Sequence, residues 1–164
     1  MQKLLREMVE TYGDRIYRLA LRYTGNREQA EDIAQETFLR AYKHLDRFDR
    51  NRPAGPWLFK IATNLCRSWN RIRRETQVEA PEKIQPAVDK SPEDIYLEKE
   101  SEAELHRVLH GLPLQYREIL LLRHVGELAY AEIAETLGLE LSVVKNRLYR
   151  GRIMLREVLQ EERR

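Results

Sequence analysis

Apolar residues recur at intervals of three and four along almost the whole chain, except between about residues 75 and 97. Such spacing places apolar side chains along one face of an α-helix. In the exceptional stretch Pro81, Pro86 and Pro92 interrupt the spacing and acidic residues predominate, as is typical of a linker. The pattern therefore predicts an all-α protein in which two small helical domains are joined by an acidic linker.

The first domain is predicted to hold three helices. The first covers residues 4–24, and Gly25 can end it in a left-handed conformation. The second begins at Asn26, where Gln29 completes a capping box, and runs to about residue 45. After a loop over residues 49–56, Pro56 fits the first position of a third helix. We expect that helix to bury the apolar residues Trp57, Leu58, Ile61, Ala62, Leu65, Trp69 and Ile72.

The second domain is predicted to hold four helices, because glycines at 111, 126 and 138 divide the helical spacing that resumes near residue 97. Its last two helices have the pattern of a helix-turn-helix, whose second helix enters the major groove of DNA. The small core shared by these helices is expected to contain Ile133, Ala134, Leu137, Leu139, Val144 and Leu148.

The side chains that would read duplex DNA fall on adjoining turns at the start of the last helix, which runs from about residue 142 to 159. Lysine and arginine donate to guanine edges, and asparagine pairs with adenine. We call these five residues the recognition set: Ser142, Lys145, Asn146, Tyr149 and Arg150.

The formal net charge of +2 conceals blocks of opposite sign. Residues 40–74 carry ten Lys or Arg and two Asp, residues 75–104 carry ten acids and three Lys, and residues 145–156 carry five bases and no acid. Basic blocks of this size indicate a polyanionic partner such as nucleic acid. Within the first block lies a basic stripe on one face of the third helix, formed by Lys60, Asn64, Arg67, Arg71 and Arg74. Alone, this stripe is equally compatible with a solvated helix surface.

The cysteine content and the hydropathy of the chain indicate the cellular compartment to expect. Cys66 is the only cysteine, so the chain can form no internal disulfide, which suits a reducing cytoplasm. The longest strongly apolar run, residues 119–122, is too short to span a membrane, and the N-terminus lacks a secretory signal pattern. We expect a cytoplasmic protein without membrane insertion.

An enzyme is the alternative from another functional class. His106 and His110 are four residues apart, a spacing that could hold a metal, but no third ligand is evident in the sequence. Cys66 is expected to be a packed thiol at a partly inward position. Glu102 and Glu104 are expected to be surface charges at the end of the linker. With no glycine-rich phosphate loop and no nucleophile–base pair, we expect no catalytic activity, no metal and no cofactor.

In this order, the motifs resemble those of bacterial RNA polymerase sigma factors of the extracytoplasmic-function subfamily (group 4). The family's D-x-x-Q-E falls on Asp32, Gln35 and Glu36, and its W-L-x-x-I-A-x-N falls on the run from Trp57 to Asn64. The segment from residue 112 to 152 resembles sigma region 4. The resemblance covers nearly the whole chain.

The resemblance implies a role for each part of the chain. Residues 1–74 would be sigma region 2, residues 75–100 the linker, and residues 101–164 sigma region 4. The acidic face formed by Asp32, Gln35 and Glu36 would bind the polymerase clamp. The basic stripe would melt and read the minus-ten element, and Asn64 with the loop before Trp57 would hold the flipped non-template base. The recognition set would read the minus-thirty-five element, and region 4 would also contact the polymerase flap.

The resemblance also implies partners: core RNA polymerase, promoter DNA as duplex and single strand, and an anti-sigma factor, with the free chain monomeric. Many relatives have a Gly-Thr pair where this chain has Ser142 and Val143, and Ser or Thr in place of Asn146. Ala129 occupies a position where Ser or Thr often caps a helix. The remaining alternative is a stand-alone helix-turn-helix regulator, which would use only the second domain.

Overall fold

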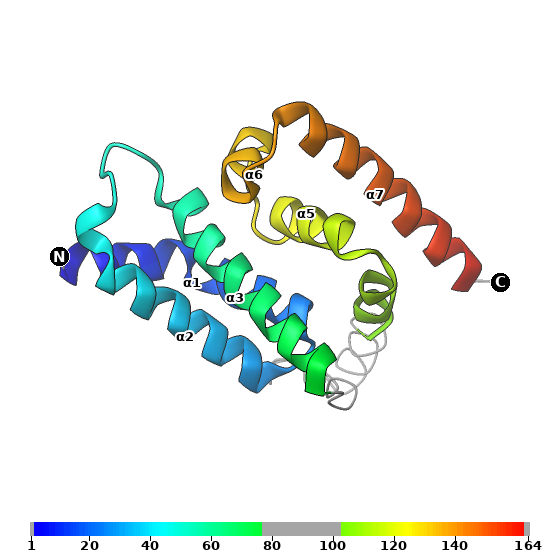
Figure 1. Cartoon of the computed structure of the whole chain (residues 1–164), viewed down its shortest axis with the longest axis horizontal. Helices are drawn as coiled ribbons and strands as arrows, with labels where there is room; N and C mark the ends of the chain where they lie inside the picture. Colours follow the sequence, from blue (N-terminus) through cyan, green and yellow to red (C-terminus); the bar gives the residue numbers. More distant parts are fainter. Residues whose placement is uncertain (1, 77–102, 163–164) are drawn as a thin grey trace, which may run out of the picture.

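The structure, a computed structural model, describes residues 2–76 and 103–162, so the expected linker lies almost wholly outside it. Across these two ranges there is no strand, which confirms the all-α prediction. The elements are α1 (Gln2–Thr24), α2 (Arg27–Lys43), the short 3-10 helix η1 (Leu45–Arg47), α3 (Ala54–Thr76), a helix over residues 103–111, α5 (Leu114–His124), α6 (Tyr130–Leu137) and α7 (Leu141–Glu162) (Figure 1). None of the described helices is long and apolar enough to cross a membrane.

The N-terminal half, residues 2–76, is a bundle of α1, α2 and α3 (Figure 1). Gly25 ends α1 as expected, with a φ of 68° and an N–H that donates to the Leu21 carbonyl at 2.8 Å. The buried faces of the three helices interlock, and the largest buried side chains there are Ile16, Tyr23, Leu58 and Phe59.

The predicted capping box at the start of α2 is half formed. The Asn26 side chain accepts a hydrogen bond from the Gln29 N–H at 3.0 Å, as predicted. The Asn26 N–H, however, donates to the Thr24 hydroxyl at 3.2 Å rather than to Gln29. Thr24, two residues before the cap, is fully buried, and its hydroxyl accepts the N–H that the Gln29 side chain would have bound.

The start and the exposed end of α3 differ from the prediction. The helix begins at Ala54, so Pro56 is its third residue, where a missing N–H still costs no intrahelical bond. Ile72, expected to be buried, is 54% exposed, because the buried line runs through Leu58, Ala62 and Cys66 and Ile72 falls at its edge. Two residues assigned to the linker, 75 and 76, continue α3.

The C-terminal half, residues 103–162, is built around α5, which is buried from Tyr116 to Leu122. α7 approaches α5 closely at Gly151, where an added Cβ would lie 3.3 Å from Leu120. The predicted helix-turn-helix core is confirmed: Ile133, Val144 and Leu148 are buried, and Ala134, Leu137 and Leu139 pack against them. Gly138, with a φ of 65°, ends α6.

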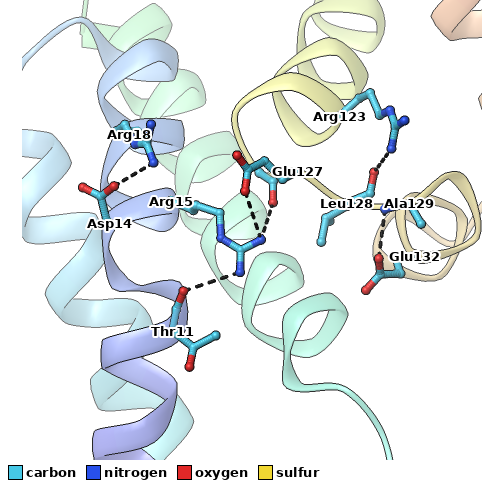
Figure 2. A network of polar contacts seen from close by, with 10 residues as sticks. Thr11, Asp14, Arg15, Arg18, Arg123, Glu127, Leu128, Ala129 and Glu132 are labelled. Atoms are coloured by element: carbon cyan, nitrogen blue, oxygen red, sulfur yellow. Dashed lines mark hydrogen bonds and ion pairs between the residues drawn. The ribbon is translucent and has the colours of Figure 1, made fainter.

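The two halves share an interface in which α5 and α6 face α1 and α3, while α7 lies on the far side (Figure 1). Arg15 of α1 donates to the Gly126 carbonyl at 3.1 Å and lies 3.8 Å from the Glu127 carboxylate, both in the turn between α5 and α6 (Figure 2). The chain thus places the two expected domains against each other rather than apart.

Candidate nucleic-acid interface

The basic stripe lies on the exposed face of α3. All five of its members are exposed, whereas Leu58, Ala62 and Cys66 on the same helix are fully buried. The amphipathic pattern of α3 therefore turns four cations and one amide outward together. A row of cations along one helix can follow a phosphate backbone.

A hollow of about 240 Å³ lies at the loop before Trp57. The Phe48 ring stacks on the Trp57 ring, with centroids 4.9 Å apart and an interplanar angle of 26°. Lys60 lines this hollow, whereas Asn64, one turn further along α3, does not. Its lining combines two aromatic rings with three cations and two carboxylates: Arg47, Phe48, Asp49, Arg52, Pro53, Pro56, Trp57, Lys60 and Glu135. Aromatic faces and cations of this kind are what bind an unstacked base.

The recognition set is exposed at the start of α7. Buried Val144 and Leu148 fix the opposite face of that helix. A second hollow of about 380 Å³ lies between α5 and α7, and it brings together three members of the set, Ser142, Asn146 and Arg150. Lys145 and Tyr149 point outside this hollow, and Tyr149 is 68% exposed.

The sequence analysis missed two polar residues beside the recognition set. Gln115 and Arg147 line the same hollow as Asn146. The sequence does contain a signal for Arg147, since Arg147 lies four residues after Val143 and three before Arg150, on the helix face that also carries Asn146. Gln115 is supplied by α5, and only the packing of α5 against α7 brings it there.

The acidic face lies on α2, where Asp32 and Gln35 are exposed and Glu36 is half-buried. Glu36 forms an ion pair with Arg40 at 3.0 Å, one turn along the helix. Gln35 also lines an apolar groove of about 890 Å³ between α1 and α2, together with Gln2, Leu5, Val9, Gly13, Asp14, Ala34, Phe38, Leu39 and Tyr42. Exposed apolar side chains gathered along one groove, here Val9, Leu39 and Tyr42, are typical of a protein contact.

One member of the basic stripe is already bound within the chain. The Arg67 guanidinium donates to both oxygens of the Glu118 carboxylate, at 2.6 and 2.9 Å. These bonds to Glu118 raise the pKa of Arg67. Tyr23 donates to the same carboxylate at 3.2 Å, and its pKa is raised by burial and by the negative charge of Glu118.

The structure describes three of the side chains that were weighed for an enzyme site: Cys66, His106 and His110. Cys66 is fully buried, more so than predicted, and burial raises the pKa of its thiol. The rings of His106 and His110 lie 4.0 Å apart, and among the described residues no group of three His, Cys, Asp or Glu side chains could hold a metal ion. Glu102 lies outside the described residues.

Two family models match the sequence, Sigma-70 region 2 over residues 8–77 and Sigma-70, region 4 over residues 102–155. The chain is 37% identical over 172 residues to the ECF RNA polymerase sigma factor SigW of Bacillus subtilis (strain 168), covering 98% of this chain and 91% of SigW. It is 40% identical over 157 residues to the ECF RNA polymerase sigma factor SigE of Mycolicibacterium smegmatis (strain ATCC 700084 / mc(2)155), covering 93% of this chain but only 60% of SigE.

Two solved structures are similar over nearly the whole chain. One is CnrH in complex with the cytosolic domain of CnrY, with 26% identity, a TM-score of 0.77 and coverage of 98% of this chain and 90% of that one. The other is the sigma factor RpoE in complex with the anti-sigma factor NepR from Bartonella quintana, with 25% identity, a TM-score of 0.78 and coverage of 96% and 98%. With both region matches in order and an alignment that covers 91% of SigW, this chain belongs to the ECF RNA polymerase sigma factors.

Proposed function

We propose that this chain binds core RNA polymerase and directs it to promoters by reading two DNA elements. The observation that carries the proposal is the pair of exposed basic surfaces on two separate helices, α3 and α7, in one ECF sigma chain. One surface suits a single strand, because it adjoins an aromatic hollow. The other suits duplex DNA, because it is the second helix of a helix-turn-helix.

Residues 1–74 act as region 2 in this proposal. The basic stripe captures the non-template strand of the minus-ten element, and the hollow beside Trp57 holds an extruded base. Unstacking a base costs a few kcal/mol. Capture of the strand by the cations of the stripe offsets that cost, so recognition and melting become one step. Since Asn64 lies outside the hollow, we assign it to the strand next to the extruded base.

Residues 101–164 act as region 4, with residues 75–100 as the connecting linker. The recognition set contacts base edges of the minus-thirty-five element. Asn146 and Arg150 share one hollow with Ser142, so they would contact neighbouring bases. The side chain of Asn146 favours adenine and that of Arg150 favours guanine.

The acidic face on α2 is the polymerase contact of the proposal, with the clamp as its partner, while region 4 contacts the flap. The apolar groove beside Gln35 extends this surface and supports a protein partner. CnrH and RpoE were solved with CnrY and NepR, which supports an anti-sigma partner for this chain as well. We place the free protein in the cytoplasm as a monomer.

A stand-alone helix-turn-helix regulator is not favoured. Such a protein would need only the C-terminal half, whereas Sigma-70 region 2 matches residues 8–77. A pull-down of core RNA polymerase separates the two functions, because a sigma factor must bind the enzyme whereas a stand-alone regulator needs only duplex DNA.

The single-strand role is tested by permanganate footprinting with core polymerase on a promoter that the wild-type chain opens. The double variant Asn64→Ala, Arg71→Ala is expected to lower open-complex formation about tenfold or more, since each lost phosphate or base contact costs about 1 kcal/mol. The double variant Gln160→Ala, Arg18→Ala, whose residues are exposed and lie outside both the stripe and the loop before Trp57, is the matched control. Equal opening by both double variants would contradict the role given to the stripe.

A further inference from the structure

Two large apolar side chains are exposed among residues 103–162, and both lie on α7. They are Leu141, which is 42% exposed, and Tyr149, which is 68% exposed. Tyr149 already belongs to the recognition set, whereas Leu141 is neither part of the apolar core nor assigned a role in the proposed function. A single exposed leucine is ordinary on most surfaces. Leu141 differs because it is the first residue of the helix that the proposed function places in the major groove.

The start of α7 determines where the Leu141 side chain lies. The N–H groups of Val143 and Val144 both donate to the Glu140 carbonyl at 3.1 Å, so the helix begins directly after Glu140. Val144 and Leu148 are buried and hold one face of α7 against the rest of the C-terminal half. The N-terminal residues of such a helix are those that contact base edges. Leu141 therefore lies at the end of α7 that meets the bases.

Leu141 also shares a helix face with two members of the recognition set. Lys145 and Tyr149 follow it at intervals of four residues, which makes the three side chains neighbours along α7. These three lie outside the hollow between α5 and α7, which the other members of the set line. The recognition helix thus offers DNA a polar row and, beside it, a row with an apolar side chain at each end.

Thymine is the base that a leucine can distinguish in the major groove. All four bases offer hydrogen-bonding groups there, and thymine alone adds a C5-methyl group. A leucine side chain has no donor or acceptor, so it leaves the polar edge of any other base unpaired where it covers that edge. Against thymine it buries a methyl group, and burial of one such group changes an affinity by about fourfold.

We infer that Leu141 is a further specificity-determining residue, which contacts the C5-methyl group of one thymine in the minus-thirty-five element. The inference rests on the proposed function of α7 as the helix that reads duplex DNA. It adds a preference that hydrogen-bonding side chains do not supply. The element therefore contains a thymine in addition to the adenine and the guanine that Asn146 and Arg150 favour.

The contact is tested by removing the methyl group and nothing else. Core polymerase with the wild-type chain first selects its upstream element from a pool of random duplex DNA. Each thymine of the selected element, on either strand, is then replaced in turn by uracil, which lacks only the C5-methyl group. Competition binding with the same polymerase gives the ratio of the affinities for the thymine and the uracil form at each position.

The wild-type chain is expected to lose affinity about fourfold when one particular thymine is replaced by uracil. Leu141→Ala is expected to bind both forms of that position equally, because alanine is too short to cover the methyl group. Leu159→Ala, the same change near the other end of α7, is the matched control and should retain the fourfold ratio. The ratio cancels any loss of affinity that is common to both DNAs, so a merely structural role of Leu141 would leave it unchanged.

Equal affinities for thymine and uracil at every position in the wild type would overturn the inference. Survival of every methyl effect in Leu141→Ala would overturn it too. If circular dichroism shows that this variant does not fold, Leu141→Gln replaces it, since glutamine is also well tolerated in a helix and removes the apolar surface. Both negative results leave the proposed function standing, because an element has been selected. If no element is selected, the proposed function fails and the inference falls with it.

Discussion

Gly126 lies in the turn between α5 and α6, where no side chain fits. A Cβ there would lie 2.8 Å from the Leu122 carbonyl oxygen and 3.2 Å from the Phe59 ring. Gly126→Ala is therefore expected to lower the free energy of unfolding by about 1–3 kcal/mol, as overpacking does. Urea titration followed by circular dichroism measures the change.

Gly111→Ala is the control for that substitution, because a Cβ at Gly111 meets nothing within 4 Å. Its free energy of unfolding should stay the same or rise by a few tenths of a kcal/mol, since alanine restricts the unfolded chain. If both variants lose equal stability, the close contact at Gly126 is not what makes the glycine necessary.

Single residues also mark what the sequence could and could not predict. The exposed positions of the basic stripe and the recognition set followed from helical spacing alone. Glu118 did not, because nothing in the sequence distinguishes a buried glutamate beside Ile119 from a surface one. Its partner Arg67 is 51 positions away, and only the packing of the two halves joins them.

At the scale of elements, a substitution at the start of α6 is expected to stabilise that helix. Ala129 occupies the N-cap position with a φ of −68° and a ψ of 157° but offers no side-chain acceptor. Its N–H donates to Glu132 at 2.9 Å, so half of a capping box is present. Ala129→Ser completes it and should raise the free energy of unfolding by about 0.5–1 kcal/mol. The control is Ala131→Ser, which changes an exposed alanine inside α6 and should lower the free energy of unfolding slightly. Thermal melting ranks the two variants. A lower melting temperature for Ala129→Ser than for Ala131→Ser would contradict the capping role.

The helix over residues 103–111 makes the fold sensitive to acid. The pKa of His106 is lowered to about 4, mainly by burial and next by the positive charge of Arg22. The pKa of His110 is lowered to about 3, mainly by burial and next by the charge of His106. Arg117 and Arg73 also face both rings, and Arg117 donates to Nδ1 of His110 at 3.0 Å. The unfolded chain, with imidazole pKa values near 6.5, therefore binds more protons than the folded chain does between about pH 6.5 and 4.

Stability should consequently fall as the pH drops below about 6.5. We expect a loss of about 2–3 kcal/mol between pH 7 and pH 5, measured by urea unfolding. The double variant His106→Gln, His110→Gln should flatten this dependence, whereas His44→Gln, which changes an exposed ring, should retain it. A pH dependence that survives in the double variant would assign the acid sensitivity to other groups.

Element boundaries were less predictable than element types. All the expected helices in the described residues are present, because periodic apolar spacing over ten or more residues is a strong signal. The start of α3 moved from Pro56 to Ala54, since proline is tolerated anywhere in the first turn. Ile72 was predicted on the buried face and is exposed, because it falls at the edge of the buried line through Leu58, Ala62 and Cys66.

At the scale of the whole molecule, the sequence predicted two helical halves but not their contact. The sequence left the relative placement of the two halves open, and the opposite charges that join them lie outside the linker, at Arg67, Glu118, Arg52 and Glu135. A contact between halves depends on matched surfaces, which no single helix pattern contains. The interface is therefore the part of this protein that required the structure.

The central claim, that this chain gives core RNA polymerase its promoter preference, is tested by selection. Core polymerase with the chain is used to transcribe a pool of random DNA, and the templates that yield transcripts are sequenced. The account predicts two shared sequence elements a few helical turns apart, upstream of the start sites, and loss of the upstream element when Asn146 and Arg150 are replaced by alanine. Transcripts no more frequent or specific than those from core polymerase alone would contradict it.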